Sequence, residues 1–497
     1  MLKKVIVPFT EFYHNFRNWQ LFLLLFTISF LVRFPFFFRD YVDRDESTFI
    51  LMAQSWVDGY LPYIQLWDLK PPVTFLFFAA IIYTFGKSFL VIRIAGVFMV
   101  TITSFVTYKI GLRLGYKKVA FWSAIALIPL QSLFGSLQGV MSEHISTAFF
   151  ITGLYWMLYK ARNLSYLITG IFFGLALMTK LNMAYAVLFL FLMEFWYGYR
   201  SGNVLKSVTK LAVIGTFILF VILLTALPYY FKGEDNIWWK SVFEAPMAYS
   251  SGQNHSIIKV LPFIIIITGF FLVAVKKKLL DFTNIKIQLL VAATLGILIS
   301  FLQAGKVNGH YLIQLYPSLV LLVGLTLYQL KFLWGINYKP YVLLFCFLLP
   351  VETYLELGNI IRNKANKGSF FNGEGIDVPN YFKEKQIKTK HLFFTEYHIG
   401  YWLLDSKPPT KAATHPSTIL RDNLFPFMDN PRKTAADELQ FIIEEHQPDY
   451  IITRKNRRVF DKKKYTANFY INLRLLENYT PLDTIDNAVI HRRLKIE

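Results

Sequence analysis

The 497-residue chain contains a single cysteine and few charged residues, and each shortage excludes a class of protein. One thiol, Cys346, cannot form a disulfide framework or a thiolate zinc site, so we expect it to serve in packing. Charged residues make up only 17% of the sequence, whereas hydrophobic residues reach 55% and aromatic residues 18%. This balance, with a mean hydropathy of +0.40, excludes an ordinary soluble domain and predicts a polytopic membrane protein.

The charge that is present is strongly basic, with 52 Lys and Arg against 32 Asp and Glu and a formal net charge of +20. In a membrane protein the basic excess is explained by interior loops rich in Lys and Arg and by attraction to anionic headgroups. The sequence has no basic stripe interleaved with exposed aromatic residues of the kind found in recognised nucleic-acid-binding modules. We therefore expect membrane lipids as partners and no nucleic acid.

Apolar runs recur from Leu21 to about Pro350, at the length of about 17 to 25 residues that crosses a hydrocarbon core of about 30 Å. They predict about eleven transmembrane helices, at 19–38, 89–110, 119–135, 143–159, 164–180, 183–198, 208–227, 258–275, 286–303, 311–330 and 340–352. The first run is too long for a signal-peptide core and lacks a cleavage pattern, so we expect it to stay in the protein. With the N-terminus inside, every basic cluster in a short loop falls on the interior face.

Two further helices are predicted outside the membrane, in a long outer loop from Arg39 to Lys87. The apolar stretch Val73 to Phe85 has only about thirteen residues, a length typical of an interfacial helix. If it crossed the membrane, every later loop would change sides. Ser47 to Asp58 has its apolar residues on one face at helical spacing and is the second predicted surface helix.

After about residue 352 the composition becomes that of a soluble domain, and an odd number of spans places this segment outside. Lys390 to Tyr397 and Asp449 to Arg454 have strand patterns, and Ala435 to His446 has a helix pattern. The predicted fold class is therefore mainly α: a polytopic membrane helix bundle, residues 1–352, followed by a C-terminal extracytoplasmic α/β domain, residues 353–497.

Ionisable residues at or within a membrane are costly to desolvate, so each is a candidate functional group. Transfer of a sugar from a lipid phosphate needs a carboxylate that accepts the proton of the acceptor hydroxyl, and cations for the phosphate. Asp45, in the charged run that follows the first span, is the preferred general base. Glu46 or Glu143 would orient the acceptor or support the base. The alternative interpretation of the run is a solvated helix end.

Cationic candidates share the predicted outer face with these acids. Lys70 precedes two prolines that fix the local backbone, and it is the first candidate to bind the donor phosphate. The further substrate-binding candidates are Arg93, Lys180, Lys306, His310 and Tyr311. The alternatives are a snorkelling Lys70 and, for the last two residues, an interfacial anchor. Asp43, Arg44 and Asp45 resemble a two-acid metal motif, but no histidine is nearby in the sequence, so we expect no metal cofactor.

Several short motifs carry a resemblance to a known superfamily. They are Asp45-Glu46-Ser47, Lys70-Pro71-Pro72, Arg93 with the apolar run after it, Met141-Ser142-Glu143, and His310 to Gln314 before Pro317. In this order they resemble the GT-C integral-membrane glycosyltransferases, in the branch of protein O-mannosyltransferases and bacterial lipid A aminoarabinose transferases.

The resemblance implies a polyprenyl-phosphate sugar donor, a reaction at the outer face, inversion at the anomeric carbon and catalysis without a metal. It implies that Asp45 is the base and that Lys70 contacts the donor phosphate. Glu143 stands where the family usually has aspartate, which is a departure from the pattern.

The expected protein is thus a glycosyltransferase of the bacterial inner membrane, with a cytoplasmic N-terminus and a periplasmic C-terminal domain. Its acceptor would be a hydroxyl of a protein, of lipid A or of another glycan. One alternative is a transporter or flippase of lipid-linked saccharides, although the ionisable residues gather at one face and not at the midplane. The other is a glycan polymerase or ligase that uses a lipid diphosphate.

Overall fold

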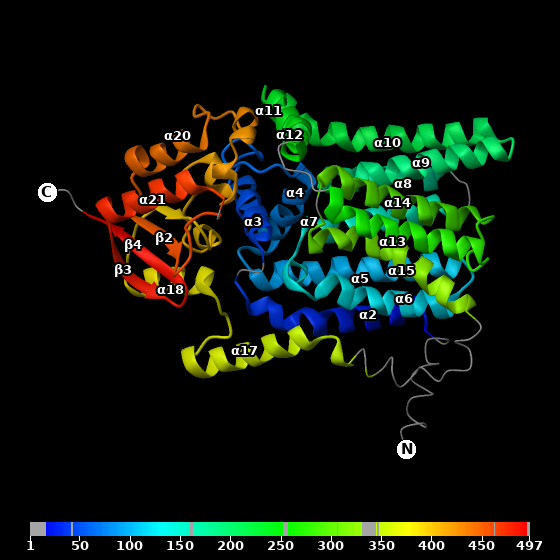
Figure 1. The fold of residues 1–497 in the computed structure, drawn as a ribbon, viewed down its shortest axis with the longest axis horizontal. Helices are drawn as coiled ribbons and strands as arrows, with labels where there is room; N and C mark the ends of the chain where they lie inside the picture. Colours follow the sequence, from blue (N-terminus) through cyan, green and yellow to red (C-terminus); the bar gives the residue numbers. More distant parts are fainter. Residues whose placement is uncertain are drawn as a thin grey trace, which may run out of the picture. The chain divides into compact units, whose positions relative to one another are not determined.

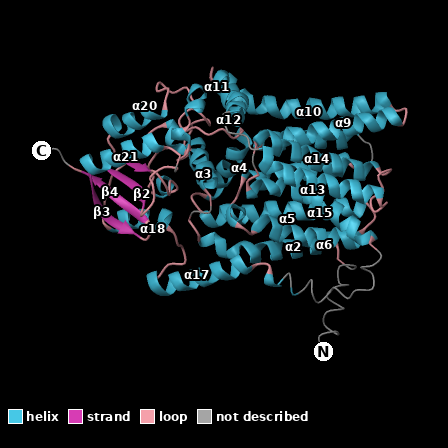
Figure 2. Ribbon diagram, viewed as in Figure 1, coloured by secondary structure: helices cyan, strands magenta, loops and turns pink. Residues whose placement is uncertain are grey.

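The structure is a computed structural model that describes residues 16–40, 43–159, 163–251, 257–305, 307–330, 344, 347–461 and 463–494. Helices dominate the fold, and one small sheet lies near the C-terminus of the chain (Figures 1 and 2). The chain forms two compact units. We call Met1–Phe37, Ile92–Thr225 and Gln253–Leu357 the bundle unit, and Phe38–Val91, Ala226–Gly252 and Gly358–Glu497 the mixed unit.

Long apolar helices form the bundle unit, and Figure 1 shows them side by side with nearly parallel axes. They are α2 (Asn18–Arg33), α5 (Phe89–Arg113), α6 (Lys117–Ser132), α7 (Ser142–Met157), α8 (Asn163–Thr179), α9 (Met183–Arg200), α10 (Val204–Tyr230), α13 (Ile257–Lys276), α14 (Ile285–Ala304) and α15 (Leu312–Gln329). In the described residues, six helical segments are long and apolar enough to cross a membrane: Asn18–Phe38, Phe89–Arg113, Val204–Tyr230, Ile258–Lys276, Ile285–Gln303 and Gly309–Gln329.

The sequence predicted about eleven spans, and most of them coincide with a helix. Four further predicted spans coincide with helices, namely α6, α7, α8 and α9. These helices are too short or too polar to count as long and apolar enough to cross a membrane. The last predicted span, 340–352, lies partly outside the described residues, and Cys346 is one of the residues outside them. The mainly α, multi-pass fold class is therefore confirmed, whereas the number eleven stays a prediction.

Small residues allow close helix packing in the bundle unit. A Cβ atom added at Gly296 in α14 would lie 2.6 Å from the carbonyl oxygen of Tyr185 in α9. Membrane helices, which gain little from the hydrophobic effect, commonly associate through such close backbone approaches. Gly296 therefore holds two neighbouring helices in van der Waals contact.

The mixed unit begins with two helices that pack on each other, α3 (Arg44–Val57) and α4 (Pro72–Phe85). The ring of Phe49 in α3 lies 6.2 Å from that of Phe75 and 5.8 Å from that of Phe78, between ring centroids. All three side chains are buried. Both predicted surface helices therefore exist as helices, and their place at a membrane surface stays a prediction.

The mixed unit also contains a four-stranded sheet, whose strand order is β1-β2-β4-β3. Its strands are β1 (Leu392–Phe394), β2 (Tyr450–Arg454), β3 (Tyr479–Ile485) and β4 (Ala488–Arg493). β1 and β2 are parallel, and the other pairs are antiparallel. Around the strands lie α18 (Glu374–Glu384), α19 (Gly400–Leu403), α20 (Ala435–Gln440) with the π-helical turn Phe441–His446, and α21 (Tyr465–Asn478).

The predicted strands at 390–397 and 449–454 and the predicted helix at 435–446 are present, the first strand in a shorter form. The hairpin of β3 and β4 was not predicted. The helix α17 (Val351–Lys367) runs across the predicted domain boundary at residue 352. In addition, α3 and α4 group with the C-terminal segment and not with the bundle. The two-domain division at that residue stays a prediction.

Candidate functional site

The first turn of α3 places two acidic side chains. Asp43 is the N-cap residue, and its side chain accepts a hydrogen bond of 2.9 Å from the backbone N–H of Asp45. Carboxylates are favoured at this end of a helix, because the N–H groups there lack intrahelical partners and carry the positive end of the macrodipole. Glu46 follows and is only 2% exposed. Asp45 is more accessible, with 26% of its side chain exposed.

Lys70 lies directly against Asp45, its Nζ 3.1 Å from Oδ2 of the carboxylate. Its backbone N–H donates to Oδ1 of Asp68 at 3.2 Å, and its carbonyl oxygen accepts a hydrogen bond of 2.6 Å from the hydroxyl of Tyr63. The ammonium also lies 5.4 Å from the centre of the Phe49 ring. The backbone of Lys70 is thus fixed on both sides, and its side chain is 16% exposed.

A histidine from the C-terminal part of the chain completes this cluster. Nε2 of His415 lies 3.4 Å from Oδ1 of Asp45, the oxygen that does not contact Lys70. His415 follows the 3₁₀ turn Lys411–Thr414. Sequence reasoning missed it, because a lone histidine in a long soluble segment has no spacing or periodicity that connects it to the first outer loop.

Burial perturbs two titratable groups beside the cluster. Burial raises the pKa of Asp68, while the nearby Lys70 ammonium acts in the opposite direction. Burial also holds the pKa of His398 well below its usual value, helped by the neighbouring His415 and Arg44. Nε2 of His398 lies 3.0 Å from Oγ1 of Thr48 in α3. His398 is therefore uncharged at neutral pH.

A second polar cluster lies in the bundle unit and gathers four of the predicted residues. Glu143, near the start of α7 and 1% exposed, forms an ion pair with Lys180, which directly follows α8. Nε2 of His310 lies 3.7 Å from Oε1 of Glu143. The ammonium of Lys180 lies 4.4 Å from the centre of the Tyr311 ring. The sequence placed these residues at one depth, and the structure brings them into contact.

The loop before Glu143 is fixed by Arg33, which sequence reasoning did not select. The buried guanidinium of Arg33 donates to four backbone carbonyl oxygens, those of Gln131, Leu137, Gln138 and Gly139, at 3.3, 2.9, 3.2 and 2.7 Å. Arg93, a predicted phosphate ligand, is fully buried and donates to the carbonyl oxygen of Phe36 at 2.9 Å. Lys306 lies outside the described residues.

No group of three or more His, Cys, Asp or Glu side chains in the described part of the chain is arranged to hold a metal ion. Asp43, one of the two acids of the motif noted in the sequence, caps the start of α3. The expected lack of a metal cofactor stays a prediction.

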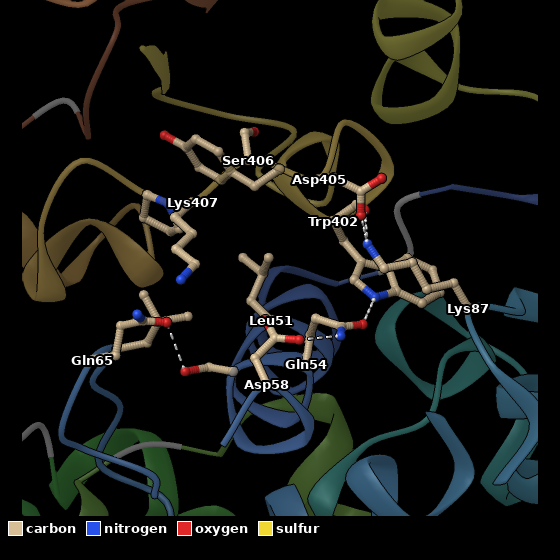
Figure 3. A pocket seen from close by; sticks show the side chains of 13 residues that line it. Leu51, Gln54, Asp58, Gln65, Lys87, Trp402, Asp405, Ser406 and Lys407 are labelled. Atoms are coloured by element: carbon tan, nitrogen blue, oxygen red, sulfur yellow. Dashed lines mark hydrogen bonds and ion pairs between the residues drawn. The ribbon is translucent and has the colours of Figure 1, made fainter. Parts of the chain in front are cut away.

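A separate pocket lies beside the C-terminal half of α3, within the mixed unit (Figure 3). Gln54 links its two walls: Oε1 accepts from the indole N–H of Trp402 at 2.9 Å, and Nε2 donates to Asp58 at 2.9 Å. An ion pair between Lys87 and Asp405 closes one side. The pocket residues on α3 lie about 9 to 20 Å along the helix axis from Asp45. Thr48 and His398, both fully buried, lie along the intervening stretch of α3. The pocket is therefore distinct from the Asp45 cluster.

The fold is similar to that of solved structures at low sequence identity. It is similar to the crystal structure of ArnT from Cupriavidus metallidurans bound to undecaprenyl phosphate, with a TM-score of 0.57 and 13% identity, covering 94% of this chain and 97% of that chain. The apo structure of the same protein gives a TM-score of 0.58 with the same identity and coverage.

A family model described as dolichyl-phosphate-mannose-protein mannosyltransferase matches residues 69–225. The matched range includes Lys70, Glu143 and Lys180 and begins after Asp45. A comparison with curated protein sequences finds no match. Together with the fold, the family model supports a membrane glycosyltransferase, as the sequence motifs predicted.

Proposed function

We propose that the protein transfers a sugar from a polyprenyl-phosphate donor to a hydroxyl acceptor at the outer face of a membrane, with inversion at the anomeric carbon. The observation that carries this proposal is the contact of 3.1 Å between the Asp45 carboxylate and the Lys70 ammonium. The carboxylate of Asp45 can accept a proton and the ammonium of Lys70 can bind a phosphate, and both side chains are partly exposed. The fold supports the same donor class, because the similar ArnT structure is described as bound to undecaprenyl phosphate.

In the proposed reaction the acceptor oxygen attacks the anomeric carbon while the bond from that carbon to the phosphate oxygen breaks. The hydroxyl proton passes to the carboxylate of Asp45, which acts as general base. The phosphate leaves with its negative charge stabilised by the ammonium of Lys70. A single displacement of this kind inverts the anomeric carbon.

The pairing of Asp45 with Lys70 links donor binding to activation of the base. The donor phosphate competes with the carboxylate for the ammonium of Lys70. Once the phosphate has taken that contact, Asp45 loses a neighbouring positive charge that favours its ionised form, and its affinity for a proton rises. Binding of the donor therefore prepares the base for the acceptor.

For the cluster of Glu143, Lys180, His310 and Tyr311, the bundle cluster, the proposed roles are those that the sequence motifs imply. Glu143 would orient the acceptor, and Lys180, His310 and Tyr311 would contact the donor, as the sequence motifs imply. Glu46, Arg93 and Lys306 keep their predicted roles as proposals. The acceptor would be a hydroxyl of a protein, of lipid A or of another glycan.

The test is an assay of purified protein in lipid nanodiscs with polyprenyl-phosphate sugars and a panel of hydroxyl acceptors. Release of polyprenyl phosphate that is lost in Asp45→Asn supports the proposal. Release of polyprenyl diphosphate from a lipid-diphosphate saccharide would indicate a polymerase or ligase instead. Movement of the intact lipid-linked sugar between leaflets, without release of either lipid, would indicate a flippase.

A further inference from the structure

The position of His415 is fixed by the residue before it, Thr414. Its hydroxyl accepts a hydrogen bond of 3.3 Å from the backbone N–H of Trp67, in the loop that leads to Lys70. Its carbonyl oxygen lies 3.5 Å from Oγ1 of Thr48, one turn along α3 from Asp45. The backbone that presents His415 is thus bound to both elements that present Asp45 and Lys70.

Hydrogen bonds also fix the tautomer of His415. Nδ1 lies 3.1 Å from the backbone nitrogen of Ser417 and 2.9 Å from the hydroxyl of the same residue. A backbone N–H can only donate, so Nδ1 must accept and carries no proton. The proton of the neutral imidazole is therefore on Nε2, the atom that lies 3.4 Å from Oδ1 of Asp45. The ring nitrogen that carries the proton is thus the one nearest the carboxylate.

We propose that His415 is a positioning residue for the general base: its Nε2–H holds the Asp45 carboxylate in place, so that the C-terminal segment completes the reaction site. The inference rests on the proposed function and deepens it. Lys70 contacts Oδ2 of the same carboxylate, and the two donors together fix the plane of the group. When the donor phosphate takes the ammonium of Lys70, the contact of His415 with Oδ1 is retained. A base misplaced by about 1 Å can lose about 100-fold in rate, so this contact bears on turnover.

Two amide substitutions separate the two sides of the ring. In His415→Asn the side-chain oxygen can still accept from Ser417, but the amide is too short to reach Asp45. In His415→Gln the amide nitrogen lies at about the position of Nε2 and can donate to the carboxylate. We expect kcat to fall about 10- to 100-fold in His415→Asn and in His415→Ala, and to recover most of this loss in His415→Gln.

His415 does not contact the donor in this scheme. The Kd and KM of the donor should therefore change less than twofold in the Asn, Ala and Gln variants of His415. A matched control is His391→Ala, which removes an exposed histidine from the same unit and should leave kcat unchanged. Thermal unfolding of each variant separates lost folding from lost positioning. If His415→Ala does not fold, the test is the comparison of kcat between His415→Asn and His415→Gln.

The outcomes are distinct. A kcat that falls in the Asn variant and recovers in the Gln variant, at constant donor affinity, supports the inference. An unchanged kcat in the Asn variant, a loss confined to donor KM, or an inactive Gln variant overturns it while leaving the proposed function intact. Wild-type protein that releases no polyprenyl phosphate overturns the proposed function, and the positioning role with it.

Discussion

Replacement of Lys70 by methionine should weaken donor binding, and the structure gives the size of the effect. A hydrogen bond to a charged group contributes about 1.5 to 3 kcal/mol. In the donor-free protein the same ammonium already contacts Asp45, a partly exposed pair for which we take a value of about 1 kcal/mol. The phosphate must displace this contact, so the net loss is about 0.5 to 2 kcal/mol. That corresponds to a Kd about 2- to 30-fold weaker for the donor.

The competition between phosphate and carboxylate gives a second, opposite expectation. Asp45→Asn removes the charge that holds Lys70, so the donor should bind more tightly than to the wild type, by up to about fivefold. In the double variant with Lys70→Met, the tightening should disappear because no ammonium remains to be released. The double-mutant cycle therefore has a coupling energy that a merely snorkelling lysine would not show.

The assay is the equilibrium Kd of a fluorescent polyprenyl phosphate in nanodiscs of uncharged lipid. Lys87→Met is the control, since Lys87 pairs with Asp405 in the separate pocket of the same unit and should leave the Kd unchanged. A donor Kd for Lys70→Met equal to that of the wild type, or additive single effects in the cycle, would refute the reasoning.

Three further predictions concern the base, the bundle cluster and pH. Asp45→Asn should abolish sugar transfer without loss of folding, and normal turnover in that variant would exclude it as the base. Lys180→Met should lower the unfolding free energy by about 3 to 5 kcal/mol, because it leaves the buried carboxylate of Glu143 without its closest cation, and Glu143→Gln in the same chain should recover part of the loss. His398 has a depressed pKa in the folded protein, so the stability it contributes is present above pH 6.5 and is lost as the pH falls below that value, by about 1.4 kcal/mol per pH unit. Thermal unfolding of His398→Gln from pH 7 to 5 should show this acid sensitivity reduced, and an unchanged slope would contradict it.

The sequence was most informative where chemistry and local structure coincide. Asp45 begins a helix that Asp43 caps, and Lys70 precedes Pro72 at the first position of the next helix. Both are local signals, and the two residues lie in the same loop segment, residues 39–87. Glu143 and Lys180 were likewise predictable at one depth, because each lies at the end of an apolar run.

The residues that the sequence missed act through contacts between distant segments. His415 reaches Asp45 through the packing of a 3₁₀ turn on α3, and no spacing rule predicts such a contact. Arg33 at the end of the first span was read as part of an apolar run, although a buried guanidinium needs several acceptors. The strand β3 was missed because most of its residues are exposed and it contains Pro481, which interrupts the pattern that marks a half-buried strand.

The helix α3 is the element through which the loop segment 39–87 and the C-terminal segment form one unit. Near its start, Arg44 forms a bidentate ion pair with Glu396, whose side chain is 2% exposed. Farther along, Gln54 accepts from the indole of Trp402. Because these contacts lie on either side of the residues that face His415, a change in the C-terminal segment alters the frame that holds Asp45. The C-terminal segment is thus built into the support of the proposed base, and acceptor recognition by that segment would act directly on the geometry of the reacting carboxylate.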